Sequence, residues 1–124
     1  MQLKRVVVTG LGALTPIGNT IEEYWNALAN GVSGAAPISH FDASKSKTRF
    51  ACEVKNFNPT DFINRKEARK MDKFTQYAMV ASDEAIADAN LDLETINKLR
   101  VGVIWGAGIG GLETLQNEVL NYAA

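Results

Sequence analysis

The chain has 124 residues, 46% of them hydrophobic, with 13 basic against 14 acidic side chains. This length suits one domain with a sizeable core, and the nearly balanced charge gives no overall attraction to nucleic acid or an anionic membrane surface. One cysteine and one histidine exclude an intramolecular disulfide framework and a multi-histidine metal site. No apolar run approaches the ~20 residues of a membrane helix, so we expect no membrane span and a reducing, cytoplasmic location.

Three segments predict strands. Residues 6–8 are consecutive valines, which favour a strand buried on both faces, and a loop rich in glycine follows at residues 9–18. Residues 49–55 alternate, which predicts a half-buried strand with Phe50, Cys52 and Val54 on its inner face. Residues 101–105 predict a second interior strand.

Two amphipathic helices and a short one are predicted between these strands. Residues 20–30 begin with a capping box at Thr20 and Glu23 and end at an Asn-Gly pair. A longer helix is expected from Asn64, which can cap the amide of Glu67, to Asn90. Its apolar stripe includes alanines that allow close approach to a neighbour, and comprises Met71, Phe74, Ala78, Ala81, Ala85 and Ala89. Residues 93–99 predict a further short helix.

A basic cluster lies at the start of the long predicted helix, and consists of Arg65, Lys66, Arg69, Lys70 and Lys73. The helix macrodipole disfavours cations at this end, so helix stability alone does not explain the placement. A solvated face is the ordinary interpretation of a charge run, and a docking site for an acidic partner is the alternative. Nucleic acid is the less favoured partner because extended phosphate contacts usually accompany a basic domain.

The two residues that most often carry catalysis have structural interpretations here. Cys52 alternates with apolar residues and has no adjacent base, so we interpret it as a buried structural cysteine. His40 lies in an irregular polar stretch without a local nucleophile, which favours a hydrogen-bonded structural histidine over a general base.

The second glycine loop, Gly106 to Gly111, formally matches the dinucleotide fingerprint G-x-G-x-x-G. The match is weak, because the acidic residue that would bind ribose would lie beyond Ala124. The alternative is that the glycines allow a tight turn and close packing of a strand and a helix. No P-loop lysine follows either glycine loop.

Five segments together resemble the bacterial β-ketoacyl-acyl carrier protein synthases, closest to the type II elongating enzyme. In chain order they are residues 6–12, 14–18, 40–42, 65–72 with 76–78, and 106–111. The resemblance covers nearly the whole chain. It implies the N-terminal part of a thiolase-like layered α/β/α/β/α fold, present as a single partial domain over residues 1–124. It also implies a homodimer when full length.

The resemblance assigns two sets of residues. The basic cluster matches the family's carrier-docking motif, so Lys66, Arg69 and Lys70, with Arg65 adjacent, would contact acyl carrier protein. Ile109 and Gly108 match the site where the acyl chain is bound, with Ile109 gating the pocket. Neither Cys52 nor His40 matches a catalytic position, and the family's nucleophilic cysteine and two catalytic histidines would lie beyond residue 124.

The sequence therefore supports three hypotheses. The first is part of a fatty-acid elongating enzyme that condenses an acyl-enzyme with malonyl-acyl carrier protein in a decarboxylative Claisen reaction. It implies no catalytic residue, metal or cofactor in this chain, which should be inactive alone. The second is a dinucleotide-binding α/β domain, and the third is a non-catalytic module that binds acyl carrier protein. Interior strands with few neighbours further predict exposed apolar edges and self-association.

Overall fold

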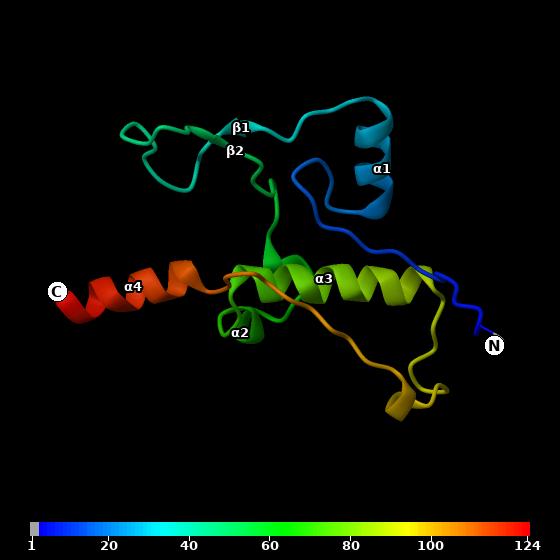
Figure 1. The fold of residues 1–124 in the computed structure, drawn as a ribbon. Coiled ribbons are helices and arrows are strands. Elements are labelled where there is room, and N and C mark those ends of the chain that lie inside the picture. The colour runs from blue at the N-terminus through cyan, green and yellow to red at the C-terminus, as the bar shows by residue number, and fades with distance from the viewer. Residues whose placement is uncertain (1–2) are drawn as a thin grey trace.

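The computed structural model describes residues 3–124 and is organised around one central helix, α3 (Figure 1). The first helix and a small hairpin lie on one side of α3, and the chain that follows α3 returns along its other side to the last helix (Figure 1). In chain order the elements are α1 (Ile21–Ala29), β1 (Ala36–Pro37), β2 (Phe50–Ala51), η1 (Pro59–Asp61), α2 (Arg65–Ala68), α3 (Lys73–Asp88), η2 (Lys98–Arg100) and α4 (Leu112–Ala123).

Helix α1 begins and ends as the sequence predicts. The Thr20 hydroxyl accepts from the Glu23 N–H, and the Glu23 carboxylate accepts from the Asn19 N–H at 2.7 Å. The chain leaves the helix at Gly31, which has a φ of 64°. The N–H groups of Gly31 and Val32 donate to carbonyls of the last turn, which forms a Schellman motif. These local signals therefore determine both ends of α1.

The N-terminal glycine segment packs directly on α3. A Cβ atom on Gly10 would lie 2.5 Å from the amide nitrogen of Ala89, and one on Gly12 would lie 2.7 Å from that of Ala85. The alanine stripe of α3 thus provides the close approach that the sequence predicted. Among the described residues, the buried apolar side chains all lie on α2 and α3: Ala68, Ala78, Val80 and Ala81.

The two predicted interior strands do not form. Residues 6–8 and 101–105 have no ladder partner within residues 3–124, and their large apolar side chains are exposed. A β-branched or apolar run favours an extended chain, but a strand also needs neighbours to pair with its backbone. The expected exposure of apolar edges is confirmed, and Ile104 is fully exposed.

The third predicted strand is reduced to a two-residue pairing, in which Ala36 and Pro37 pair antiparallel with Ala51 and Phe50. The predicted inner face is wrong for two of its three residues. Phe50 and Cys52 are exposed, whereas Ala51 and Glu53 are partly buried. Cys52 is therefore a free, exposed thiol rather than a buried one, because no other segment of residues 3–124 covers this face of the hairpin.

The long predicted helix is two helices. The chain leaves helical geometry after Ala68, and α3 begins after Asp72. Asn64 caps α2 as predicted, but its side chain accepts from the Lys66 N–H and not from Glu67. At the far end, Asn90 adopts φ 52° and closes α3 in a second Schellman motif. The predicted helix at 93–99 is also shorter, since only η2 forms.

Candidate functional site

The basic segment, residues 65–70, forms an exposed cationic surface at one end of α3. The charged side chains of Arg65, Lys66, Arg69 and Lys70 are all exposed. Lys70 pairs with Glu67 at 2.8 Å, and within residues 3–124 the other three have no acidic group within 4 Å. Charges without internal partners can be offered to an external acidic group.

The break between α2 and α3 corrects the macrodipole argument. Helix α2 is a single turn, and Arg69 is its C-terminal cap instead of lying in the first turns of a long helix. Cations at this end are not adverse. Lys73 still lies at the N-terminus of α3, so the correction applies to Arg69 and Lys70, and support for docking comes mainly from the exposed and mostly unpaired charges.

Gln76 of α3 holds the basic segment in place. Its side-chain amide donates to the carbonyl oxygens of Ala68 at 2.9 Å and Met71 at 3.2 Å. Ala68 is the last residue of α2, where its carbonyl also accepts from the Met71 N–H, and Met71 lies in the turn that joins α2 to α3. One side chain on α3 thus fixes the turn that carries Arg69 and Lys70.

The second glycine loop packs on the same end of α3. A Cβ atom on Gly110 would lie 2.6 Å from the Phe74 ring, so a residue with a side chain would displace that ring. Gly111 is the N-cap of α4 at φ 71°, a left-handed conformation that favours glycine. Ile109 is 76% exposed, and no atom of the described residues lies within 4 Å of a Cβ placed on Gly108.

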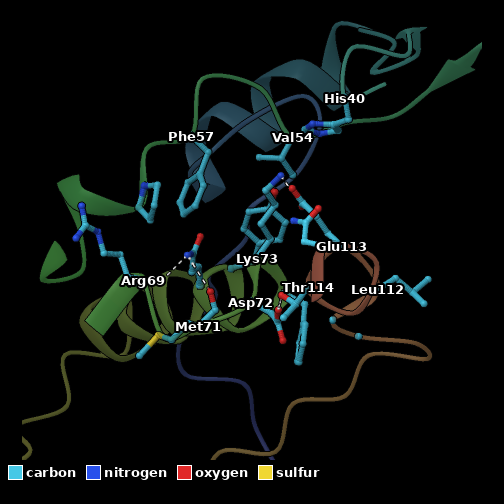
Figure 2. Close-up of a pocket in the computed structure, with 18 of the residues that line it drawn as sticks. His40, Val54, Phe57, Arg69, Met71, Asp72, Lys73, Leu112, Glu113 and Thr114 are labelled. Carbon is cyan, nitrogen blue, oxygen red and sulfur yellow. Dashed lines mark hydrogen bonds and ion pairs between the residues drawn. The ribbon is translucent and has the colours of Figure 1, made fainter. Parts of the chain in front are cut away.

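The basic segment and the glycine loop meet at one pocket of about 760 Å³ (Figure 2). Arg69 and Ile109 both line it, and Lys73 adds a second cation. Apolar lining comes from Val54, Phe57, Met71, Phe74, Tyr77 and Leu112. Phe57 is fixed by an edge-to-face contact with Tyr77 at a centroid distance of 5.1 Å. The carboxylates of Asp72 and Glu113 also line the pocket, so its charges are balanced and its apolar side chains would receive an apolar group.

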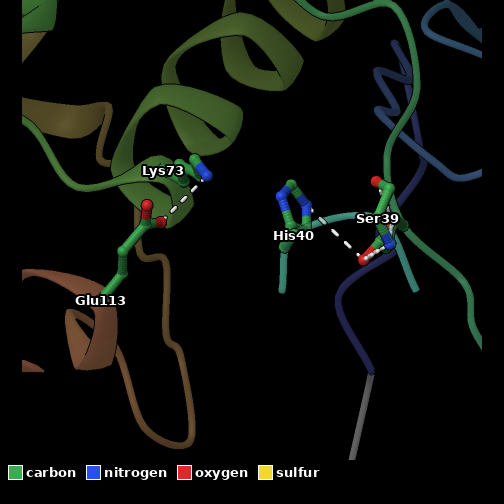
Figure 3. Close-up of polar contacts among 5 residues, drawn as sticks. Ser39, His40, Lys73 and Glu113 are labelled. Atoms are coloured by element: carbon green, nitrogen blue, oxygen red, sulfur yellow. Dashed lines mark hydrogen bonds and ion pairs between the residues drawn. The ribbon is translucent and has the colours of Figure 1, made fainter. Parts of the chain in front are cut away.

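Two polar contacts join the N-terminal ends of α3 and α4 beside this pocket. The Thr114 hydroxyl donates to Asp72 Oδ1, and Lys73 Nζ lies 2.9 Å from Glu113 Oε2 (Figures 2 and 3). We call these four residues the α3–α4 clasp. The clasp holds the start of α4, and with it the glycine loop, against α3.

The clasp also counts against a dinucleotide site. A pyrophosphate would lie at the N-terminus of α4, where free N–H groups attract anions. The Asp72 carboxylate already occupies this end, with Oδ2 at 3.0 Å from a Cβ placed on Gly111. A second anion would be repelled there, and the close contacts of Gly110 and Gly111 with Phe74 and Asp72 indicate that the glycines serve packing on α3.

His40 reaches the pocket rim and has a carboxylate neighbour. Its Nε2 lies 3.9 Å from Glu53 Oε1, and its side chain is about half exposed (Figure 3). No side-chain hydrogen bond of His40 forms within residues 3–124, so the expected structural hydrogen bond is not seen. The Ser39 hydroxyl donates to Glu53 at 2.6 Å and holds the pKa of that carboxyl below its usual value.

Within residues 3–124, no group of three or more histidine, cysteine or acidic side chains is arranged to hold a metal ion. In the same range no helix is long and apolar enough to cross a membrane.

Residues 3–123 match the family described as Beta-ketoacyl synthase, N-terminal domain. The chain belongs to this family. It is 51% identical over 118 residues to 3-oxoacyl-[acyl-carrier-protein] synthase 2 of Synechocystis sp., which covers 95% of this chain and 28% of that protein. The Staphylococcus aureus protein of the same name is 50% identical over 115 residues, with 93% and 28% covered. The chain thus spans a little over a quarter of the length of these relatives.

Solved structures of ketosynthases are also similar to this chain. A β-ketoacyl synthase from Burkholderia phymatum superposes with a TM-score of 0.76 at 30% identity, covering 98% of this chain and 31% of that one. A type II PKS ketosynthase, solved with its acyl-carrier protein, gives 0.71 at 27% identity, covering 95% and 30%. The thiolase-like fold class is confirmed, and this chain forms a small α/β part of it.

The structure brings together some of the residues that the sequence selected. Arg69 and Ile109 line one pocket, whereas Gly108, Arg65, Lys66 and Lys70 lie outside its lining. Sequence reasoning did not predict the contacts that organise the site, which are made by Gln76, Asp72, Glu113 and Thr114, although Asp72 and Gln76 lie in segments that carry the family resemblance. Asp72 also had a local signal, as an N-cap residue before the apolar run of α3.

Proposed function

We propose that this chain provides the carrier-docking surface and one wall of the acyl pocket in a fatty-acid elongating 3-oxoacyl-[acyl-carrier-protein] synthase. Such an enzyme carries an acyl chain on a thiolate, decarboxylates malonyl-acyl carrier protein, and joins the two in a Claisen condensation. The basic segment would receive the acidic carrier protein. Ile109 and Gly108 would contact the acyl chain. A homodimer and a cytoplasmic location belong to this proposal.

One observation carries the proposal: Arg69 of the basic segment and Ile109 of the glycine loop line the same pocket. A carrier protein that docks on exposed cations would release its thioester-linked chain next to the docking surface. The apolar lining of the pocket would then remove that chain from water, which is favourable in proportion to the apolar area buried. Membership of the family and the carrier complex of the PKS neighbour agree with this assignment.

Carrier binding is the direct test. We expect the chain to bind acyl carrier protein, with an affinity that falls as salt rises because exposed charges are screened. Changing Lys66, Arg69 and Lys70 to Glu should weaken binding on the order of 100-fold, from roughly 1 kcal/mol for each exposed pair lost. A matched control changes Lys4, Lys45 and Lys47 to Glu, which alters net charge equally at exposed positions elsewhere. Equal binding by both variants would refute the docking assignment.

Catalysis is tested separately. We expect the purified 124-residue chain to form no condensation product from an acyl donor and malonyl-acyl carrier protein, because no residue in it is assigned a catalytic role. Malonyl-dependent product, followed by mass spectrometry of the carrier, would contradict this. Carrier binding without activity in any longer form of the protein would instead favour the non-catalytic module.

A further inference from the structure

The α3–α4 clasp lies next to the basic segment, residues 65–70. Lys73 is the first residue of α3, it lines the pocket together with Arg69, and it is paired with Glu113 of α4. Both partners of this pair are about half exposed or more, so water and salt screen their attraction. A carboxylate brought to Arg69 by a docked partner could therefore replace Glu113 at Lys73 with little loss.

Asp72 has two arrangements available. It is the N-cap residue of α3 with the extended backbone typical of that position, yet its side chain makes no capping bond to its own helix. Its carboxylate accepts from Thr114 instead. Rotation of this side chain would exchange the bond to α4 for a cap on α3, so loss of the contact with α4 is compensated.

Ile109 depends on the clasp for its position. Within residues 3–124, residues 102–110 make no backbone hydrogen bond as donors. The loop is held by Gly110 against Phe74, by Gly111 beside Asp72, and by the clasp that follows immediately. A change in the contacts of the clasp therefore alters the position of Ile109, because the few residues between them donate no backbone hydrogen bond that would hold Ile109 independently.

We propose that the α3–α4 clasp positions Ile109, and that an acidic carrier protein docked on the basic segment loosens the clasp by drawing Lys73 away from Glu113. Docking would then move the apolar wall of the pocket at the moment when an acyl chain arrives. Asp72, Lys73, Glu113 and Thr114 are positioning residues in this scheme. The inference rests on the proposed function, since it needs the carrier to bind at residues 65–70.

The test follows the δ1-methyl NMR signal of Ile109 in the 124-residue chain, with and without unacylated acyl carrier protein. Three variants are compared with the original: Glu113→Gln, Thr114→Val and Thr114→Ser. Both Glu113 and Thr114 are exposed, so these changes leave the packing intact. The methyl signals of Ile21 on α1 and Ile86 within α3 are the controls for an unchanged fold.

In the original chain, carrier binding should shift the Ile109 signal while the two control signals stay in place. Glu113→Gln and Thr114→Val should move Ile109 toward its carrier-bound position before any carrier is added, and the carrier should then add little. Thr114→Ser keeps the hydroxyl and should restore the original response. Glu113→Gln should also tighten carrier binding about 2- to 5-fold, because Lys73 is released from its internal partner.

An Ile109 shift that is identical in the original chain and in both disrupting variants would overturn the inference, because the carrier would then act by direct contact. That outcome leaves the proposed function standing, since binding is measured in the same titration. Absence of salt-sensitive carrier binding in the original chain would overturn both.

Discussion

The backbone of Gly12 lies on α3 at Ala85, so closely that a Cβ on Gly12 would fall 2.7 Å from the Ala85 amide nitrogen. Helix backbone cannot yield at such a distance, and a methyl group must displace the whole N-terminal segment. We expect Gly12→Ala to lower the free energy of unfolding by about 1–3 kcal/mol, as for other overpacked sites. Urea denaturation followed by circular dichroism measures this change.

Gly102 provides the matched control. A Cβ there would meet no atom of residues 3–124 within 4 Å, and its backbone lies outside the left-handed region. Gly102→Ala should therefore leave stability unchanged or raise it by up to about 1 kcal/mol through the unfolded chain. Equal destabilisation by the two variants would contradict the close packing of Gly12 on α3.

Glu84 of α3 secures the same segment by a different contact. Its carboxylate accepts from the backbone N–H groups of Ala13 at 2.8 Å and Ile21 at 2.7 Å, and Ile21 is the first residue of α1. Glu84→Gln replaces one acceptor by an amide donor, which opposes one of these N–H groups. We expect a loss of about 1.5–3 kcal/mol in unfolding free energy. Its neighbour Asp83 is exposed, so Asp83→Asn should change stability by less than about 0.5 kcal/mol.

The features that the sequence predicted correctly are those with a local cause. Thr20 and Glu23 cap α1 because the capping partners lie three residues apart, and Gly31 ends it because few residues accept its left-handed backbone. The predicted strands at 6–8 and 101–105 failed for the opposite reason. Their formation depends on neighbours far along the chain, and a run of valines does not identify those neighbours.

The candidate site divides in the same way. The charges of the basic segment and the isolated large side chain of Ile109 stand out in the sequence, and the family resemblance gave them roles. The contacts between Asp72 and Thr114, and between Lys73 and Glu113, join segments about forty residues apart. No periodicity or spacing relates such residues, so only the folded chain reveals the clasp.

The Ser39–Glu53 contact predicts a measurable titration. The Ser39 hydroxyl is the main cause of the low pKa of Glu53, and removing it in Ser39→Ala should raise that pKa toward its usual value. A pKa lowered by folding stabilises the fold above the unfolded-state pKa, and this contribution is lost as pH falls through the folded-state pKa. Ser39→Ala should therefore reduce the acid sensitivity that Glu53 contributes. Carboxyl ¹³C shifts measured against pH give the values.

Asp42 and Ser44 provide an internal control for this titration. The Ser44 backbone N–H, at 3.0 Å, is the main cause of the low pKa of Asp42, with the Ser44 hydroxyl second. Ser44→Ala should raise the pKa of Asp42 only partly and leave Glu53 unchanged. A Glu53 pKa that moves equally in both serine variants would show that the Ser39 hydroxyl is not its specific cause.

Exposed apolar chain predicts self-association. Residues 101–105 present large apolar side chains without a covering layer, and the backbone from 102 to 105 donates no hydrogen bond within residues 3–124. Such a segment can pair with another copy edge to edge. We expect the sedimentation coefficient of the 124-residue chain to rise with concentration in the micromolar range.

Ile104→Lys should shift the distribution toward monomer, because a charge at a fully exposed apolar position opposes pairing. Gln116→Lys adds the same charge on exposed α4 and should have no such effect. A monomer at all concentrations, or equal effects of the two lysines, would show that residues 101–105 do not drive association.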